Sequence, residues 1–394
     1  MLGLIIRISY RLAVAVLVLM LPAAAFAQNF SSRQYPYLYK SPRAMGMGGA
    51  YIAIGGRVDS LFYNPAALIN IPKDKGWEVN LLNLNATASQ NSIDFSKDLQ
   101  DALDTGDLNN DGSSDDDQTK AVNNVIAKYQ GKNLHLSVTD FTSIGKSSDT
   151  FAFGVGGLAS GMMNAVPHQG FGSTGLLEVD ANMTYGGIGG FSYALVDGLY
   201  AGLTAKSLHR ESVKHIFTAQ EIVDHQDDIG DYLKDQVRET GGAVGFDAGV
   251  LWKFARDSWW RPSVGLSVMN IGDLDFKAAG VLPQTINAGL AINPKISTFR
   301  SLLIGVDYVD ITNNYTQDTD MAKRIRFGGE LQLFEITPVE IAIRAGIYQN
   351  SPTFGLDLRL LTFLLSYTRY TEEVGAYAGQ DKDTRHLVTF NFGW

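Results

Sequence analysis

Apolar and polar residues alternate with a period of two along much of the C-terminal half of the chain. The clearest stretch has one face made by Val339, Ile341, Ile343, Ala345 and Ile347. The other face includes Glu340, Arg344 and Tyr348. This period belongs to a β-strand whose two faces meet different surroundings. In a soluble sandwich the apolar face would pack into a core, whereas in a transmembrane barrel it would meet lipid.

Segments of this kind recur often enough to make a large sheet. We predict about fourteen strands, near residues 77–88, 132–143, 149–160, 175–196, 199–217, 241–254, 260–271, 283–292, 299–311, 322–333, 338–348, 351–358, 360–370 and 385–394. The intervening gaps alternate between short and long, as expected when each strand reverses direction across a membrane. The short gaps, which include Asp197–Gly198 and Arg359, are expected in the periplasm. The sequence therefore predicts an all-β membrane protein with its barrel in residues 76–394 and its longest external loops at 89–131 and 218–240.

The C-terminal strand carries the strongest signal for a membrane barrel. The chain ends RHLVTFNFGW, with Val388, Phe390, Phe392 and Trp394 at alternate positions. A terminal aromatic residue on such a strand resembles the signal that outer-membrane assembly machinery recognises. We therefore expect insertion into the cell outer membrane of a Gram-negative-type bacterium, with outer-membrane lipid and the assembly machinery as partners.

The N-terminal 27 residues have the organisation of a secretory signal peptide. Arg7 and Arg11 precede an apolar run over residues 12–21, and Ala25-Phe26-Ala27 supplies small residues before the expected cleavage at Gln28. The alternative is a membrane anchor, but the apolar run is shorter than the roughly 20 residues that a spanning helix needs. The signal peptide is assigned to residues 1–27.

Charge and cysteine content exclude several classes of function. The formal net charge of the chain is −9, and removal of the two arginines in residues 1–27 makes the mature chain more acidic. An acidic chain argues against nucleic acid as a partner. Because the chain has no cysteine, it has neither a lipoprotein anchor nor a disulfide framework.

A glycine-rich segment lies between the signal peptide and the first strand, in residues 28–75. Gly46, Gly48 and Gly49 allow the backbone to turn tightly or to approach another surface closely. We expect a short helix from Leu61 to Leu68, capped by Asp59 or Ser60, with Pro65 tolerated in its first turns.

Two motifs in this segment resemble those of a known superfamily. RAMGMGGA at residues 43–50 and YNPAAL at residues 63–68 resemble the N-terminal signature of FadL-like outer-membrane barrels. This superfamily includes fatty-acid and aromatic-hydrocarbon channels, PorV-like secretion barrels and TraF-like conjugation-associated proteins. The resemblance implies a fourteen-stranded barrel in which residues 28–75 form a plug. Asn64, Pro65 and Ala66 then match its Asn-Pro-Ala element, and Gly46, Gly48 and Gly49 match its glycine-rich turn. Segments 245–254 and 263–276 resemble the secretion-associated and conjugation-associated branches.

Charged residues within the apolar strands are expected to face the lumen. They are Arg326, Glu330, Arg344, Asp357 and Arg359. A charge facing lipid at the middle of the bilayer costs roughly 2 to 4 kcal/mol, which favours the inward orientation. Their opposite signs suggest pairing across adjacent strands.

An acidic stretch in the first external loop resembles a calcium-binding loop. Asp107, Asn109, Asp111 and Asp115 occupy ligand positions, with Gly112 at the turn. Gln118 stands where a bidentate carboxylate belongs, so the loop is either a weak calcium site or a solvated acidic surface. No other cofactor is implied.

The sequence contains no motif that identifies an enzyme. The six histidines are His135, His168, His209, His215, His225 and His386. They are scattered, and neither a Gly-x-Ser-x-Gly elbow nor a His-Glu-x-x-His pair is present. We expect no enzymatic activity, although a hydrolase using a strand-borne Ser and His remains an open alternative.

Two functions are compatible with these features. The first, which the sequence favours, is passive uptake or export of small hydrophobic molecules, of the fatty-acid or hydrocarbon type, through a plugged outer-membrane channel. The second is a non-transporting barrel that anchors or assists a secretion or conjugation system, with proteins of that system as partners. A continuous apolar passage with a sideways opening would favour the first. A lumen packed by the plug and by paired charges would favour the second.

Overall fold

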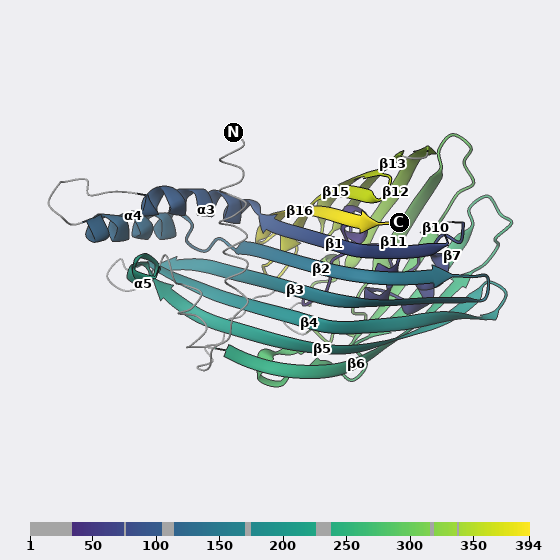
Figure 1. The fold of residues 1–394 in the computed structure, drawn as a ribbon, viewed down its shortest axis with the longest axis horizontal. Coiled ribbons are helices and arrows are strands. Elements are labelled where there is room, and N and C mark those ends of the chain that lie inside the picture. Colours follow the sequence, from purple (N-terminus) through teal and green to yellow (C-terminus); the bar gives the residue numbers. More distant parts are fainter. Residues whose placement is uncertain are drawn as a thin grey trace.

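The chain forms a closed antiparallel barrel in the computed structural model (Figure 1), and each strand pairs with its neighbours along the chain. The model describes residues 34–74, 76–104, 114–169, 175–225, 238–315, 319–336 and 339–394. The predicted signal peptide lies outside these residues. The sheet closes where β1 pairs with β16, so Leu84 lies opposite Phe390.

All fourteen predicted strands are confirmed. In chain order the barrel strands are β1 (Trp77–Ser89), β2 (Leu134–Ser147), β3 (Phe151–Gln169), β4 (Gly175–Val196), β5 (Leu199–Thr218), β6 (Arg238–Lys253), β7 (Pro262–Met269), β10 (Thr285–Ile292), β11 (Ser301–Tyr308), β12 (Ile325–Ile336), β13 (Val339–Tyr348), β14 (Ser351–Leu360), β15 (Phe363–Glu373) and β16 (Lys382–Gly393). A separate two-stranded sheet pairs β8 (Leu274–Asp275) with β9 (Val281–Leu282).

The two faces of the wall differ as the period-two pattern predicts. Along β15, Phe363 and Leu365 are 49% and 54% exposed and point outward, whereas the alternate residues Leu364 and Ser366 are buried. The outward face of the wall is therefore apolar, as a surface in contact with lipid requires. Within the described residues, no helix combines the length and the apolar character needed to cross a membrane.

Short connections lie at one end of the barrel, here called the turn end, and longer ones at the other, called the loop end. The prediction of a turn at Arg359 is wrong, because β14 continues to Leu360 and the turn falls at Leu361, whose φ is +54°. Strand β3 also runs to Gln169, which removes most of the expected loop 161–174. At the loop end, Gln349 and Asn350 form a tight turn with positive φ at both residues.

Three helices cover the long strands at the loop end: α3 (Gln90–Leu103), α4 (Ser114–Lys128) and α5 (Ala219–Asp224). Figure 1 shows them beyond the left-hand ends of β1 to β5. Val122, Ile126, Phe217 and Ile222 are buried together in a small apolar cluster under these helices. Val122, Val125, Ile126 and Tyr129 have helical spacing in the sequence, which is consistent with α4. The sequence did not predict α3, which begins after Ser89, whose hydroxyl accepts from the Ser92 amide.

Residues 34–74, here called the N-terminal segment, contain three short helices: α2 (Pro42–Gly46), η1 (Val58–Phe62) and η2 (Pro65–Asn70). Two further single turns, η4 (Lys277–Ala279) and η5 (Met321–Lys323), lie in the loop-end connections. The prediction of one helix over residues 61–68 is wrong. Asn64 is extended, with φ −154° and ψ 107°, because the ring of Pro65 disfavours a helical conformation at the residue before it.

The N-terminal segment runs from the loop end of the barrel to the turn end. At its start, the Tyr315 hydroxyl from a loop-end connection donates to the carbonyl of Gln34. At its end, Lys73 pairs with Asp149 in the turn between β2 and β3. The last residues of the segment lie at the turn end, where they lead into β1.

Candidate functional site

The glycine-rich turn of the N-terminal segment lies directly against the wall at β12, β13 and β14. Gly48 has φ +63°, and a β-carbon there would overlap the carbonyl oxygen of Phe327. Its amide donates to the hydroxyl of Thr353 at 3.1 Å, and that hydroxyl donates to the carbonyl of Gly46 at 3.0 Å. Glycine is required at residue 48 for both the backbone conformation and the close approach.

The Asn-Pro-Ala element contacts the opposite side of the wall. Asn64 is fully buried, and its Nδ2 donates to the carbonyls of Ile52 at 2.9 Å and Val250 at 3.1 Å. Its Oδ1 accepts from the amide of Ala66 at 3.0 Å and caps η2. In β5, a β-carbon on Gly202 would overlap the backbone of Pro65 and Ala66. Asn64 thus joins two parts of the segment to β6.

Asp307 on β11 binds the middle of the N-terminal segment. Its Oδ2 accepts from the backbone amides of Tyr51 at 2.6 Å and Ile52 at 2.8 Å. The carboxylate satisfies two donors that would otherwise be buried without a partner. Asp307 was not predicted as a site residue from the sequence. Its position on the inward face of a predicted strand was the available signal.

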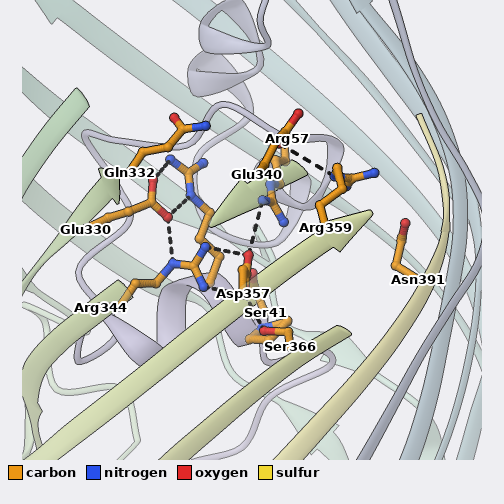
Figure 2. Close-up of polar contacts among 12 residues, drawn as sticks. Ser41, Arg57, Glu330, Gln332, Glu340, Arg344, Asp357, Arg359, Ser366 and Asn391 are labelled. Atoms are coloured by element: carbon orange, nitrogen blue, oxygen red, sulfur yellow. Dashed lines mark hydrogen bonds and ion pairs between the residues drawn. The ribbon is translucent and has the colours of Figure 1, made fainter. Parts of the chain in front are cut away.

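A continuous chain of charged residues joins the segment to β12, β13 and β14. Nε and Nη2 of Arg43 donate to the two oxygens of Glu330 at 2.9 and 2.7 Å. Glu330 also accepts from Nε of Arg344 at 2.6 Å, and Arg344 donates two hydrogen bonds to Asp357 at 2.7 and 2.6 Å. Asp357 lies 3.5 Å from Arg57, back on the segment. Figure 2 shows Glu330, Arg344, Asp357 and Arg57 side by side. The chain therefore starts and ends on the segment.

The other two charged residues singled out from the sequence lie apart from this chain. Arg326 is buried with its guanidinium 4.1 Å from the ring centroid of Tyr348. Arg359 donates to the carbonyl of Gly393 at 3.1 Å and lies 3.7 Å from Glu340 on the neighbouring strand. Both side chains face inward, but the five residues do not form one ladder.

A second charged cluster at the loop end was not found from the sequence. Lys40 on the segment pairs with Glu372, which also lies 3.9 Å from Arg385, and Arg385 donates to Asp383 at 2.8 Å. All four side chains are at least nine-tenths buried. Burial lowers the pKa of Lys40 to about 8, against the opposing attraction of Glu372. The segment is thus held by charge pairs near both of its ends.

A cavity of about 1,030 Å³ lies at the turn end of the lumen, below the N-terminal segment. Its lining combines charged, amide and aromatic side chains, among them Arg57, Glu78, Asn80, Tyr200, Glu340, Arg359, Asn391 and Trp394. Figure 2 shows Arg57, Glu340, Arg359 and Asn391 around this space. Aliphatic side chains such as Ile54, Ile71 and Leu364 also line the cavity, so its wall is mixed in character.

The structure does not test the predicted calcium loop. Asp107, Asn109 and Asp111 lie outside the described residues, and the side chain of Asp115 is also outside them. Helix α4 begins at Ser114, and Gln118 donates to the carbonyl of Leu103 at 2.9 Å. Within the described residues, no three His, Asp or Glu side chains are grouped as a metal site. Calcium binding at residues 107–118 stays a prediction.

Comparison with known proteins gives one family and one fold. A family model described as "F plasmid transfer operon, TraF, protein" matches residues 61–329, which is more than half of the chain. The barrel superposes on a deletion mutant of the monoaromatic hydrocarbon channel TodX with a TM-score of 0.50 and 11% identity, covering 93% of this chain and 100% of that one. The toluene transporter TbuX of Ralstonia pickettii gives a TM-score of 0.49 and 11% identity over 91% of this chain and 99% of that one. No curated protein matches the sequence.

Proposed function

This chain belongs to the TraF family of F plasmid transfer operon proteins, and from that premise we propose that it is a closed, non-transporting barrel that anchors or assists a transfer or secretion system. Its fold is that of FadL-like outer-membrane barrels. The proposal reverses the order of the two functions weighed from the sequence. The observation that carries it is the charge chain from Arg43 to Arg57, which fixes the N-terminal segment to the wall.

The N-terminal segment is bonded to several strands of the barrel wall, as expected for a segment that closes the lumen and does not move. It is bound to β6 through Asn64, to β11 through Asp307, and to β12 and β14 through charged pairs. Moving it would break these bonds together and leave several charges buried without partners, each costing several kcal/mol. We propose that residues 28–75 act as a plug that stays in place, and that the turn-end cavity faces the periplasm, where partner proteins of a transfer system are located.

Conductance tests whether the barrel is closed. The purified full-length protein in a planar lipid bilayer should show almost no ion current, and a variant lacking residues 34–74 should show steady pore-sized steps. Frequent open steps in the wild type would contradict the closed barrel.

The association with a transfer system needs a test in cells. In a host that carries a conjugation system, deletion of the gene should lower the transfer frequency, and the intact gene should restore it. Uptake of a radiolabelled aromatic hydrocarbon should stay unchanged in the same strains. Normal transfer with reduced uptake would instead support a channel.

Passage of small hydrophobic molecules remains a second candidate because of the likeness to the TodX channel. One feature of the wall favours it. Gly186 in the long strand β4 has φ +149°, and a β-carbon there would overlap the carbonyl of Ser207. Such a position marks a local distortion of the strand, and a distortion in a barrel wall can support a sideways exit. The uptake measurement above separates the two candidates.

A further inference from the structure

The outward face of the wall changes character along β15 and β16. From the turn end toward the loop end, the exposed outward positions are Phe363, Leu365 and then Tyr367 on β15, and Phe390 and Val388 on β16. The next outward positions are Arg369 and His386, which lie opposite each other in the register. The apolar band of the barrel therefore ends, on these two strands, at the guanidinium of Arg369 and the imidazole of His386.

A small groove of about 280 Å³ lies at this boundary. Side chains from β15, β16 and the first turn of α3 line it: Gln90, Asn91, Arg369, Lys382, Thr384 and His386. It lies on the outside of the barrel and is separate from the turn-end cavity. The groove is polar although it adjoins the apolar surface that contacts lipid.

The groove concentrates positive charge on an otherwise acidic protein. The chain carries a net charge of −9, yet the groove lining contains two cations, Arg369 and Lys382, and no carboxylate. Within the described residues, no salt bridge joins Arg369 or Lys382 to an acidic side chain. Glu373, opposite Lys382 in the register, accepts instead from the backbone amides of Gly379 and Asp381.

The floor of the groove is held in position by hydrogen bonds. Nδ1 of His386 lies 2.8 Å from the Tyr367 hydroxyl, and Nε2 lies 3.2 Å from Oε1 of Gln90. The amide nitrogen of Gln90 donates to Asp94, one turn further along α3, at 3.1 Å. Arg369 and Lys382 are exposed and have their donors available for a ligand.

We propose that this groove binds the phosphate-bearing headgroup of an outer-leaflet lipid. Lipid phosphates lie at the edge of the apolar layer, which is the height at which the outward face changes from Leu365 and Val388 to Arg369 and His386. A guanidinium and an ammonium both bind phosphate strongly. Because the groove adjoins the lipid-contacting band, lipid is the molecule that faces it. The proposal requires the loop end to face the outer leaflet and is otherwise independent of the barrel's function.

Native mass spectrometry of the purified full-length protein tests the site. The probes are diphosphorylated lipid A, the same lipid after removal of its phosphates, and inorganic phosphate. The test variant is the double substitution Arg369→Gln and Lys382→Gln. The matched control is Lys97→Gln with Lys120→Gln, which removes two exposed positive charges from α3 and α4 at the same end of the barrel.

The wild type and the control should bind diphosphorylated lipid A equally, and the double variant should bind it at least about tenfold more weakly, because it loses two charge-assisted contacts. Arg369→Lys should retain most of the binding. Because the substituted residues face outward, all variants should show wild-type mobility as folded barrels on unboiled gels. Three results would overturn the proposal: equal binding by the double variant, equal binding of the dephosphorylated lipid, or binding of inorganic phosphate as tight as that of the lipid.

Discussion

Arg43, on the N-terminal segment, donates through Nε and Nη2 to the two carboxylate oxygens of Glu330 on β12, at 2.9 and 2.7 Å. The two residues are 287 positions apart in the sequence. Both are buried, and Glu330 also accepts a hydrogen bond from Arg344. The pair therefore joins the segment to a network that runs through three strands of the wall.

Removing one member of this pair should loosen the segment. Arg43→Met leaves Glu330 with one cation fewer and should lower stability by about 3 kcal/mol, because breaking a buried pair leaves charge uncompensated. The temperature at which the barrel loses its compact form on gels measures this loss. Combining Arg43→Met with Glu330→Met should cost less than the sum of the single substitutions. An additive result would show that the two residues are not coupled.

A β-carbon added at the contact between segment and wall should displace the segment. In Gly202→Ala the added β-carbon would overlap the backbone of Pro65 and Ala66. We therefore expect this variant to conduct more ions than the wild type in a planar bilayer. Gly187→Ala is the matched control, because it adds the same atom to neighbouring β4 with nothing within 4 Å. The closed-segment model is contradicted if Gly202→Ala stays as closed as Gly187→Ala.

Sequence pattern was sufficient for the wall but not for what fills it. A period of two fixes which face of a strand is apolar, so the fourteen strands and the inward position of Glu330 and Arg344 followed from local sequence. The same pattern does not identify which residue an inward side chain contacts. Asp307 binds amides 256 and 255 positions away, and Lys40 binds Glu372 across 332 positions. The alternation of polar and apolar residues within one strand does not indicate such a distant partner.

The errors in the N-terminal segment also have a local cause. The apolar residues after Asp59 have helical spacing, yet Asn64 begins a helix instead of continuing one, since the following proline imposes an extended conformation on it. Helix α3 was missed because its polar, acidic surface resembles a solvated loop. Its buried residues, such as Phe95 and Ala102, are too few to make a clear apolar face.

The sidedness of the barrel can be read by labelling, because the chain has no native cysteine. Cysteine at Lys120, which is exposed on α4, should react with a membrane-impermeant maleimide on intact cells. Cysteine at Asp197, which is exposed in the tight turn between β4 and β5, should react only after the outer membrane is permeabilised. Labelling of residue 197 alone on intact cells would reverse the orientation.

The terminal aromatic side chain should matter for assembly more than for the folded barrel. Trp394 is 54% exposed, and its backbone, not its ring, pairs with Val79 across the closing seam at 2.9 and 2.7 Å. Trp394→Ala keeps those bonds. We expect less folded protein in the outer membrane but an unchanged melting temperature of the barrel that does assemble. Wild-type amounts of folded Trp394→Ala protein in the outer membrane would contradict a role for Trp394 as an assembly signal.

Asn64 distinguishes a fixed segment from one that moves with a ligand. Its side chain makes three hydrogen bonds, to Ile52, Val250 and Ala66, and is fully buried. Asn64→Ala leaves those backbone groups without partners, each at a cost of about 1 kcal/mol or more. If the segment is a fixed closure, the variant should melt at a lower temperature and conduct ions more often, with uptake of an aromatic hydrocarbon unchanged at matched protein levels. Gln substituted for Asn70, whose Nδ2 makes one bond to Ile54, is a milder control within the same helix. A selective fall in hydrocarbon uptake by Asn64→Ala, with stability intact, would assign the element to gating and favour the channel.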